Sequence, residues 1–288
     1  MTTVTETARA KLNLYLHVTG RRDDGYHLLD SLVAFASAGD VLTARQADAL
    51  TLAVDGPFAA ALRDEPDNLV LRAARALAVA TGGKGGAALT LTKNLPVASG
   101  IGGGSTDAAA ALRALSRLWY ATPPRDVLDA IAVRLGADVP VCLDGCTAFI
   151  GGIGERRDRA PALPAAGLVL VNPRIPLATP AVFGKRTGPF SQPSRFATPP
   201  RDAVALAEQL RARRNDLTEP ARALVPAIGE VLDAIAASPG CLLDRMSGSG
   251  ATCFGLYAST DIAERAASWL AARKPGWWVL PTALAGPE

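Results

Sequence analysis

Residues 96–110 read PVASGIGGGSTDAAA, a glycine-rich loop that runs directly into an alanine-rich helix. A helix amino terminus presents unpaired N–H groups and the positive end of the dipole, and glycines let the backbone come close to an anion. Residues 108–115 are strong helix formers, and Ser105, Thr106 or Asp107 is placed to cap the helix. The stretch therefore predicts a phosphate-binding loop.

This loop differs from the two best-known phosphate loops. A Walker loop ends in Gly-Lys-Ser/Thr, but no lysine lies between Lys93 and the far end of the helix. The dinucleotide fingerprint needs a glycine at its sixth position, which is Ser105 counted from Gly100 and Asp107 counted from Gly102. Taken alone, the segment also allows a flexible glycine turn before an ordinary helix.

Composition narrows the function classes. The 288 residues are 49% hydrophobic and 20% charged, with a net charge of +3 and 5% aromatic residues, and the basic residues are scattered, so nucleic acid binding has little support. There is no secretory signal and no run long enough to span a membrane, so we expect a cytoplasmic protein. The cysteines lack metal-ligand spacing and are expected as reduced thiols: Cys142, Cys146, Cys241 and Cys253.

Strict alternation over residues 10–19 predicts a half-buried strand with Lys11, Asn13, Tyr15 and His17 on one face, followed by a turn and a returning strand over 26–36. Hairpins mixed with helices favour an α+β class, with a boundary near residues 155–165. Further strands are expected at 41–43, 50–54, 87–91, 168–171, 241–245, 251–257 and 277–280. Helices are expected at 69–81, 126–135, 203–213, 221–237 and 261–273, and an exposed loop at 184–201.

Phosphoryl transfer needs positive charge near the phosphates and a group that activates the acceptor oxygen. Lys11 and Lys93 are the candidate cations, although each is also typical of a solvated lysine on a strand. Asp138, in the segment GADVP, is the candidate base, and an Asp that bonds local backbone in a turn is the alternative. A second glycine turn, residues 246–253 (MSGSGATC), either closes over phosphates or links two strands.

A lysine strand, a glycine-serine loop at a helix and a late glycine-serine turn, in this order, resemble the three motifs of the GHMP kinases. That resemblance implies a two-domain α+β fold, with an N-terminal ribosomal-S5-like domain (residues 1–158), a C-terminal ferredoxin-like domain (159–288) and the active site in the cleft between them. Residues 10–14, 24–27, 67–69, 100–105 and 136–140 are most similar to the branch whose acceptor is 4-diphosphocytidyl-2-C-methyl-D-erythritol in the non-mevalonate isoprenoid pathway.

The resemblance implies a role for each matched residue. Asp138 would be the general base on the acceptor 2-hydroxyl, and Lys11 would hold it ionised. ATP is the implied phosphate donor, with Mg²⁺ whose ligands are not assigned. The implied ATP site is Asn68, Lys93, Pro96, Val97, Ala98, Ser99, Gly100, Ile101, Gly102, Gly103, Gly104, Ser105 and Thr106. The implied substrate site is Asn13, Tyr26, His27, Thr179 and Phe183, with Tyr26 and Phe183 stacking on cytosine and His27 bonding its edge.

Three positions depart from the family's commonest pattern. Ile101 replaces a frequent leucine, and Thr106-Asp107 stands where many members have Ser-Asn. Because Asp107 adds negative charge to a phosphate site, we expect it to point away or to cap the helix. The alternatives are another GHMP kinase, of mevalonate or homoserine type, and a non-catalytic nucleotide-binding or RNA-binding protein of the same fold.

Overall fold

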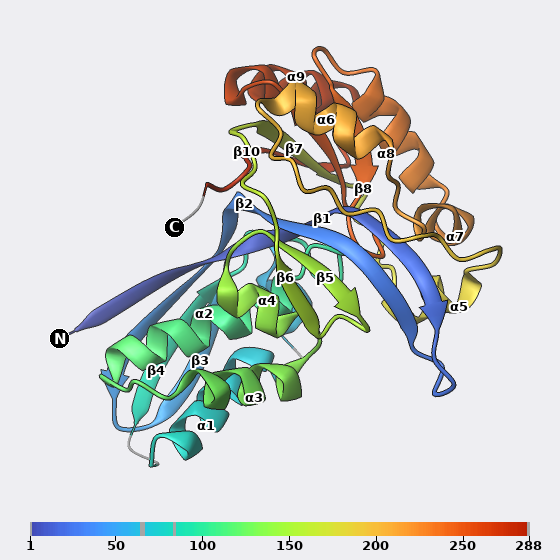
Figure 1. Ribbon diagram of the computed structural model, residues 1–288. Coiled ribbons are helices and arrows are strands. Elements are labelled where there is room, and N and C mark those ends of the chain that lie inside the picture. The colour runs from blue at the N-terminus through green and yellow to red at the C-terminus, as the bar shows by residue number, and fades with distance from the viewer. Residues whose placement is uncertain (1, 64–66, 83–84, 287–288) are drawn as a thin grey trace. The chain divides into compact units, whose positions relative to one another are not determined.

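The computed structural model describes residues 2–63, 67–82 and 85–286 (Figure 1). The chain forms two compact units that interleave in sequence. Unit 1 holds the residues up to Ala10, Ala38–Val97 and Gly102–Gly145, and unit 2 holds Lys11–Ser37, Ala98–Ile101 and the chain from Cys146 onward. The domain boundary expected between residues 158 and 159 stays a prediction.

Two long paired strands, β1 (Thr3–Arg21) and β2 (His27–Ala47), contribute to both units. The expected separate strand at 41–43 is part of β2, because nothing in the sequence there interrupts the extended chain. Residues 10–18 of β1 are buried on both faces, so the expectation of a half-buried strand was wrong. The polar face is buried because its side chains bond one another, as Tyr15 does when its hydroxyl donates to Asp30.

In unit 1, β4 (Gly86–Thr92) pairs antiparallel with the end of β2 and parallel with β3 (Leu50–Asp55). A short 3₁₀ turn, η1 (Ala59–Leu62), follows β3. Four helices accompany this sheet: α1 (Leu69–Ala80), α2 (Gly103–Leu118), α3 (Arg125–Leu135) and the unpredicted α4 (Val139–Asp144). Apolar residues of the strands and of α1 and α2 form one core, including Leu42, Leu77, Leu89 and Leu115.

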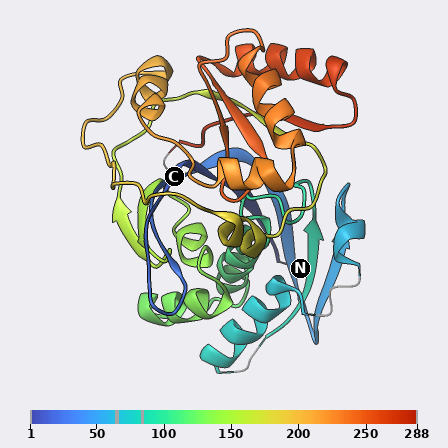
Figure 2. The same cartoon turned by 90° about the vertical axis from the view of Figure 1, so that its right-hand side faces the viewer.

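In unit 2, β5 (Ala148–Gly152) pairs antiparallel with the start of β2 and with β6 (Arg156–Arg159), and neither β5 nor β6 was expected. A second, antiparallel sheet has the order β10-β7-β9-β8. Its strands are β7 (Gly167–Asn172), β8 (Leu243–Met246), β9 (Cys253–Tyr257) and β10 (Trp278–Ala283). Helices α8 (Ala227–Ala236) and α9 (Thr260–Arg273) pack against this sheet (Figure 2).

The remaining helices of unit 2 are α5 (Thr179–Lys185), α6 (Ala203–Arg211) and α7 (Thr218–Leu224). The single helix expected over 221–237 was wrong: α7 ends at Leu224 and α8 begins at Ala227, because Pro226 cannot continue a helix that precedes it. The loop expected at 184–201 begins two residues later, because α5 extends to Lys185; no helix or strand occurs over residues 186–202. The predicted α+β class is confirmed, and no helix among the described residues is long and apolar enough to cross a bilayer.

Candidate active site

The helical half of the glycine loop lies in unit 1. Helix α2 begins at Gly103, after Gly102 with a left-handed φ of 69°. No side chain caps this helix, so the expectation that Ser105, Thr106 or Asp107 would cap it was wrong. The reason is local: the left-handed turn at Gly102 starts the helix early, and the Thr106 hydroxyl donates to the Gly103 carbonyl at 2.9 Å. The N–H groups of the first turn therefore remain available to an anion.

The first half of the loop lies in unit 2, against the late glycine turn. The Thr252 N–H donates to the Ser99 carbonyl at 3.0 Å, and the Ser247 hydroxyl donates to the Gly100 carbonyl at 2.9 Å. Gly100 has a φ of +75°, and a Cβ there would lie 2.5 Å from the Ser247 carbonyl oxygen. Two of the three motifs recognised in the sequence are thus in contact, and the second glycine turn is more than a link between two strands.

The lysine strand, β1, also contacts the glycine loop. The Lys11 N–H donates to the Ile101 carbonyl at 2.9 Å, and the Lys11 ammonium donates to Asn13 Oδ1 at 3.0 Å. Asn13 in turn donates to the Ser31 hydroxyl at 2.8 Å. Lys11 is only 4% exposed, which excludes the alternative of a solvated strand lysine. A buried ammonium is costly unless it has a partner, and Asn13 Oδ1 is such a partner for Lys11.

Asp138 immediately precedes α4, and its carbonyl accepts the Cys142 N–H at 3.2 Å. The Asp138 residue is half-buried. Because Asp138 belongs to unit 1 and Lys11 to unit 2, the meeting of their side chains stays a prediction.

Asn68 and Lys93, both expected near the nucleoside, lie in unit 1. Asn68 Oδ1 accepts the Val70 N–H at 2.9 Å and caps α1. The Lys93 ammonium is 2% exposed and donates to Asp40 at 2.5 Å and to Asp107 at 2.8 Å. Burial opposes the charge of Lys93, but the two carboxylates outweigh it and its pKa lies above the usual value. Asp107 therefore turns inward to a lysine rather than capping the helix.

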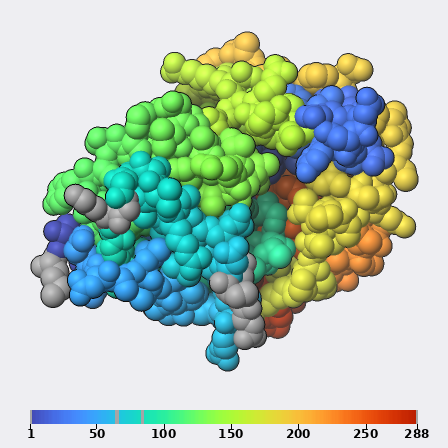
Figure 3. Space-filling model, turned by 90° about the horizontal axis from the view of Figure 1, so that it is seen from below, coloured from blue at the N-terminus to red at the C-terminus, as the bar shows by residue number. Residues whose placement is uncertain are grey.

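Two residues of the expected cytosine site, His27 and Phe183, lie side by side near the β1–β2 turn of unit 2. The rings of His27 and Phe183 lie 5.0 Å apart at 31°. Figure 3 shows the blue turn beside the yellow segment that carries α5. Burial, with Arg21 and Arg186, holds the pKa of His27 below its usual value of 6.5. Tyr26 is 60% exposed, which leaves its ring open to a planar ligand.

Thr179 connects this region to the late glycine turn. Its hydroxyl lies 2.7 Å from the Ser249 hydroxyl, so the first residue of α5 is hydrogen-bonded to residues 247–252. The substrate role of Thr179 stays a prediction.

Sequence reasoning missed the buried acid that fastens the 186–202 loop. Asp30, on β2, accepts the Ser194 N–H at 2.8 Å and Arg195 Nε at 2.9 Å, in addition to the Tyr15 hydroxyl. The available signal was an acid in the mostly apolar stretch of residues 28–36. Such an acid is rarely buried unless it is paired.

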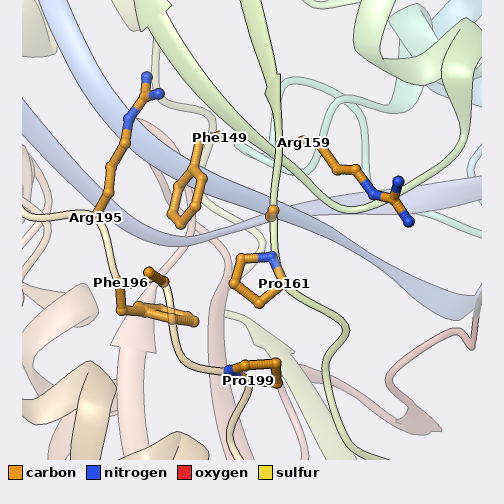
Figure 4. A pocket seen from close by; sticks show the side chains of 8 residues that line it. Phe149, Arg159, Pro161, Arg195, Phe196 and Pro199 are labelled. Carbon is orange, nitrogen blue, oxygen red and sulfur yellow. The ribbon is translucent and has the colours of Figure 1, made fainter.

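Unit 2 also contains a cavity of about 550 Å³ that holds none of the predicted site residues. Figure 4 shows the rings of Phe149, Pro161, Phe196 and Pro199 around a common space, with the guanidinium groups of Arg159 and Arg195 turned away from it. In the described part of the chain, no three His, Cys, Asp or Glu side chains are grouped to hold a metal ion.

Comparison with known proteins identifies the family of the chain. Residues 68–146 match the GHMP kinases N terminal domain, and residues 197–275 match the GHMP kinases C terminal domain. A 4-diphosphocytidyl-2-C-methyl-D-erythritol kinase of Paramagnetospirillum magneticum is 58% identical over 284 residues, 99% of each chain. One from Parvibaculum lavamentivorans is 58% identical over 98% of this chain and 99% of its own.

Solved structures agree. A crystal structure of 4-(cytidine 5'-diphospho)-2C-methyl-D-erythritol kinase superposes with a TM-score of 0.79 at 36% identity, over 98% of this chain and 100% of that one. A homoserine kinase from Cytophaga hutchinsonii shares the fold, with a TM-score of 0.72 at 16% identity over 99% of this chain and 95% of that one. The chain therefore belongs to the GHMP kinases and, within them, to the 4-diphosphocytidyl-2-C-methyl-D-erythritol kinases.

Proposed function

We propose that this chain transfers the γ-phosphoryl group of ATP to the 2-hydroxyl of 4-diphosphocytidyl-2-C-methyl-D-erythritol. The observation that carries the proposal is the full-length identity of 58% to kinases named for this acceptor. The neighbouring, tilted rings of His27 and Phe183 support a cytidine-containing acceptor, because a planar base needs an aromatic surface and a hydrogen-bonding edge. An acceptor such as mevalonate or homoserine has no ring to use that pair.

Phosphoryl transfer depends mainly on positioning and on electrostatic stabilisation. Asp138 is the proposed general base on the acceptor hydroxyl, and Lys11 is proposed to keep that carboxylate ionised and to neutralise charge on the transferring group. The bond from the Lys11 ammonium to Asn13 supports this role, because it restricts a flexible side chain to one direction. Asn13 and Thr179 are the proposed contacts of the substrate's polar chain.

The proposed nucleotide site is the glycine loop, residues 96–106, with Asn68 and Lys93 beside it. The first turn of α2 would hold the phosphates through its N–H groups. Mg²⁺ would neutralise charge between the β- and γ-phosphates. We assign this ion no ligand among the described residues.

We also propose a domain division and a cellular location for the protein. We propose a nucleotide-binding domain over residues 1–158 and a second domain over 159–288, because the two family matches fall on either side of this boundary. A cytoplasmic location is proposed from the biosynthetic role that the relatives' name implies.

The test is ATP consumption measured with three acceptors: the CDP-linked methylerythritol, mevalonate and homoserine. We expect turnover with the first alone, with one equivalent of ADP released per phosphomonoester formed, followed by ³¹P NMR. Comparable kcat/KM for mevalonate or homoserine would assign the chain to another branch. Binding of ATP without turnover of any acceptor would make it a non-catalytic member.

A further inference from the structure

We propose that Asp107 couples nucleotide binding to proton uptake: it takes up a proton when phosphate occupies the first turn of α2. The inference rests on the proposed ATP site and adds to it a positioning residue that the family match does not assign. Three observations carry it, namely the place of a buried ionic cluster, its excess of negative charge and one bare carboxylate oxygen.

The cluster lies directly beneath the start of α2. The Lys93 ammonium bridges Asp40 on β2 and Asp107 on α2, with N–O distances of 2.5 and 2.8 Å. A Cβ built on Gly103 would lie 3.4 Å from Lys93 Nζ and 4.0 Å from Asp40 Oδ2. Since Gly103 is the first residue of the helix, a phosphate at this helix terminus would lie above the cluster.

The cluster carries two carboxylates for one ammonium, and the two carboxylates are not equivalent. Asp40 Oδ1 accepts the N–H groups of Asn94 and Leu95 at 2.6 and 2.9 Å, and its Oδ2 accepts the Lys93 ammonium, so both oxygens of Asp40 have donors. Asp107 Oδ1 is buried and has no hydrogen-bond partner among the described residues. An ionised carboxylate with a bare buried oxygen is costly, so Asp107 is the member that accepts a proton.

The electrostatics point the same way. Burial raises the pKa of Asp107 to about 7, with Lys93 opposing the shift and Asp40 adding to it. Several charged groups on the elements packed around α2 form ion pairs with one another and not with the cluster: Arg72 and Arg75 of α1 with Asp67, Arg125 of α3 with Asp129 and with Asp144 of α4, and Arg113 and Arg117 of α2 with Glu6 of β1. Asp126 of α3 is exposed to solvent.

The sign of the coupling follows. Below about pH 7 Asp107 is protonated, the cluster is neutral and the helix terminus attracts phosphate fully. As the pH rises through that value, the cluster gains a negative charge that repels the triphosphate. One partly screened charge at this range changes affinity by roughly threefold to tenfold. By linkage, bound triphosphate raises the pKa of Asp107 and draws a proton from the buffer.

The experiment is isothermal titration of the full-length protein with Mg²⁺ and AMP-PNP at pH 6 to 8.5, in buffers of different ionisation enthalpy. The number of protons bound is compared between wild type and Asp107→Asn, so the nucleotide's own titration cancels. We expect excess uptake near neutral pH in the wild type alone, and roughly threefold to tenfold tighter binding by Asp107→Asn at pH 8. Asp126→Asn, an exposed acid on α3, is the control and should retain the wild-type uptake.

A second arm uses only the wild type, with adenosine in place of AMP-PNP. Uptake should vanish because no phosphate lies at the helix terminus. Equal uptake by wild type and Asp107→Asn, or equal uptake with adenosine, would overturn the coupling while leaving the ATP site intact. Absence of AMP-PNP binding by the wild type would overturn the ATP site, and this inference with it.

Discussion

At the scale of single residues, Asp138 is the group on which the proposed chemistry depends most. Asp138→Ala should lower kcat by about 10²- to 10⁴-fold, because it removes the base that accepts the proton of the acceptor hydroxyl. The Kd for ATP should change little, since the base acts in the chemical step. Steady-state kinetics and nucleotide titration measure the two effects separately.

Asp144→Ala is the matched control for that experiment. Asp144 lies at the end of the same short helix and pairs with Arg125 near the surface, so its loss should leave kcat unchanged. Near-native turnover of Asp138→Ala would remove the proposed base.

His27 should titrate below its usual pKa of 6.5, because burial and two arginines disfavour its charged form. The neutral ring therefore predominates at pH 7. Its contribution to stability is present above pH 6.5 and is lost as the pH falls through the lower folded-state value. An NMR titration of the His27 ring should show this, and Arg186→Gln should move the midpoint upward. A midpoint above 6.5 contradicts the interpretation.

The same ring supports a kinetic prediction. His27→Ala should mainly raise KM for the cytidine-containing acceptor, because the base edge loses its partner and Phe183 loses its ring neighbour. The KM for ATP serves as the internal control and should stay constant. An unchanged acceptor KM would mean that the cytosine site lies elsewhere.

Candidate motif residues could be proposed from the sequence because phosphate binding requires particular residue types at particular spacings. The residues that they contact in the folded protein could not be predicted. Asp40 lies 53 residues from Lys93 and 67 from Asp107, and only the folded β2 brings it to them. For Asp107, beside a phosphate loop, the sequence suggested a side chain that points away or caps the helix; the cap was wrong, and the buried Lys93 that binds its carboxylate could not be predicted.

At the scale of elements, the contact between the glycine loop and the late glycine turn should depend on Gly100. Gly100→Ala places a methyl group 2.5 Å from the Ser247 carbonyl oxygen. Gly188→Ala is the control in the same unit, since Gly188 also has a positive φ but has open space around it. Both share the left-handed strain of roughly 1 to 2 kcal/mol. Gly100→Ala should lose about 1 to 3 kcal/mol more in urea unfolding, and equal losses would contradict the packing.

Elements with clear periodicity, such as α1 and β4, could be predicted closely from the sequence. Helices α4, α5, α7 and α8 could not be predicted in this way, because each begins or ends near a proline. Val139-Pro140 and Thr179-Pro180 suggest turns, yet each proline occupies the first turn of a helix, α4 and α5, where its missing N–H costs nothing. Pro226 acts in the opposite way and divides one apolar stripe between α7 and α8.

At the scale of the whole molecule, the two compact units interleave in sequence, and the six-stranded sheet has strands in both of them. β1 and β2 each begin in one unit and end in the other, and the glycine loop changes unit between Ile101 and Gly102. A composition shift near residue 158 cannot reveal that β1 and β2 belong to both units, because a strand that passes from one unit to the other has no distinct local sequence pattern. Each unit nevertheless has its own apolar core.

Two buried cysteines allow those cores to be followed separately. Cys142 in unit 1 is 2% exposed and Cys253 in unit 2 is fully buried, and burial also raises the pKa of Cys253. Cys146 is exposed. In native buffer at pH 8, a thiol reagent should label Cys146 rapidly and leave the other two unmodified, because labelling requires an accessible thiolate. In increasing urea, mass spectrometry of labelled peptides should then report the opening of each core. Rapid native labelling of Cys253 would contradict the packing of β7, β8 and β9 around it.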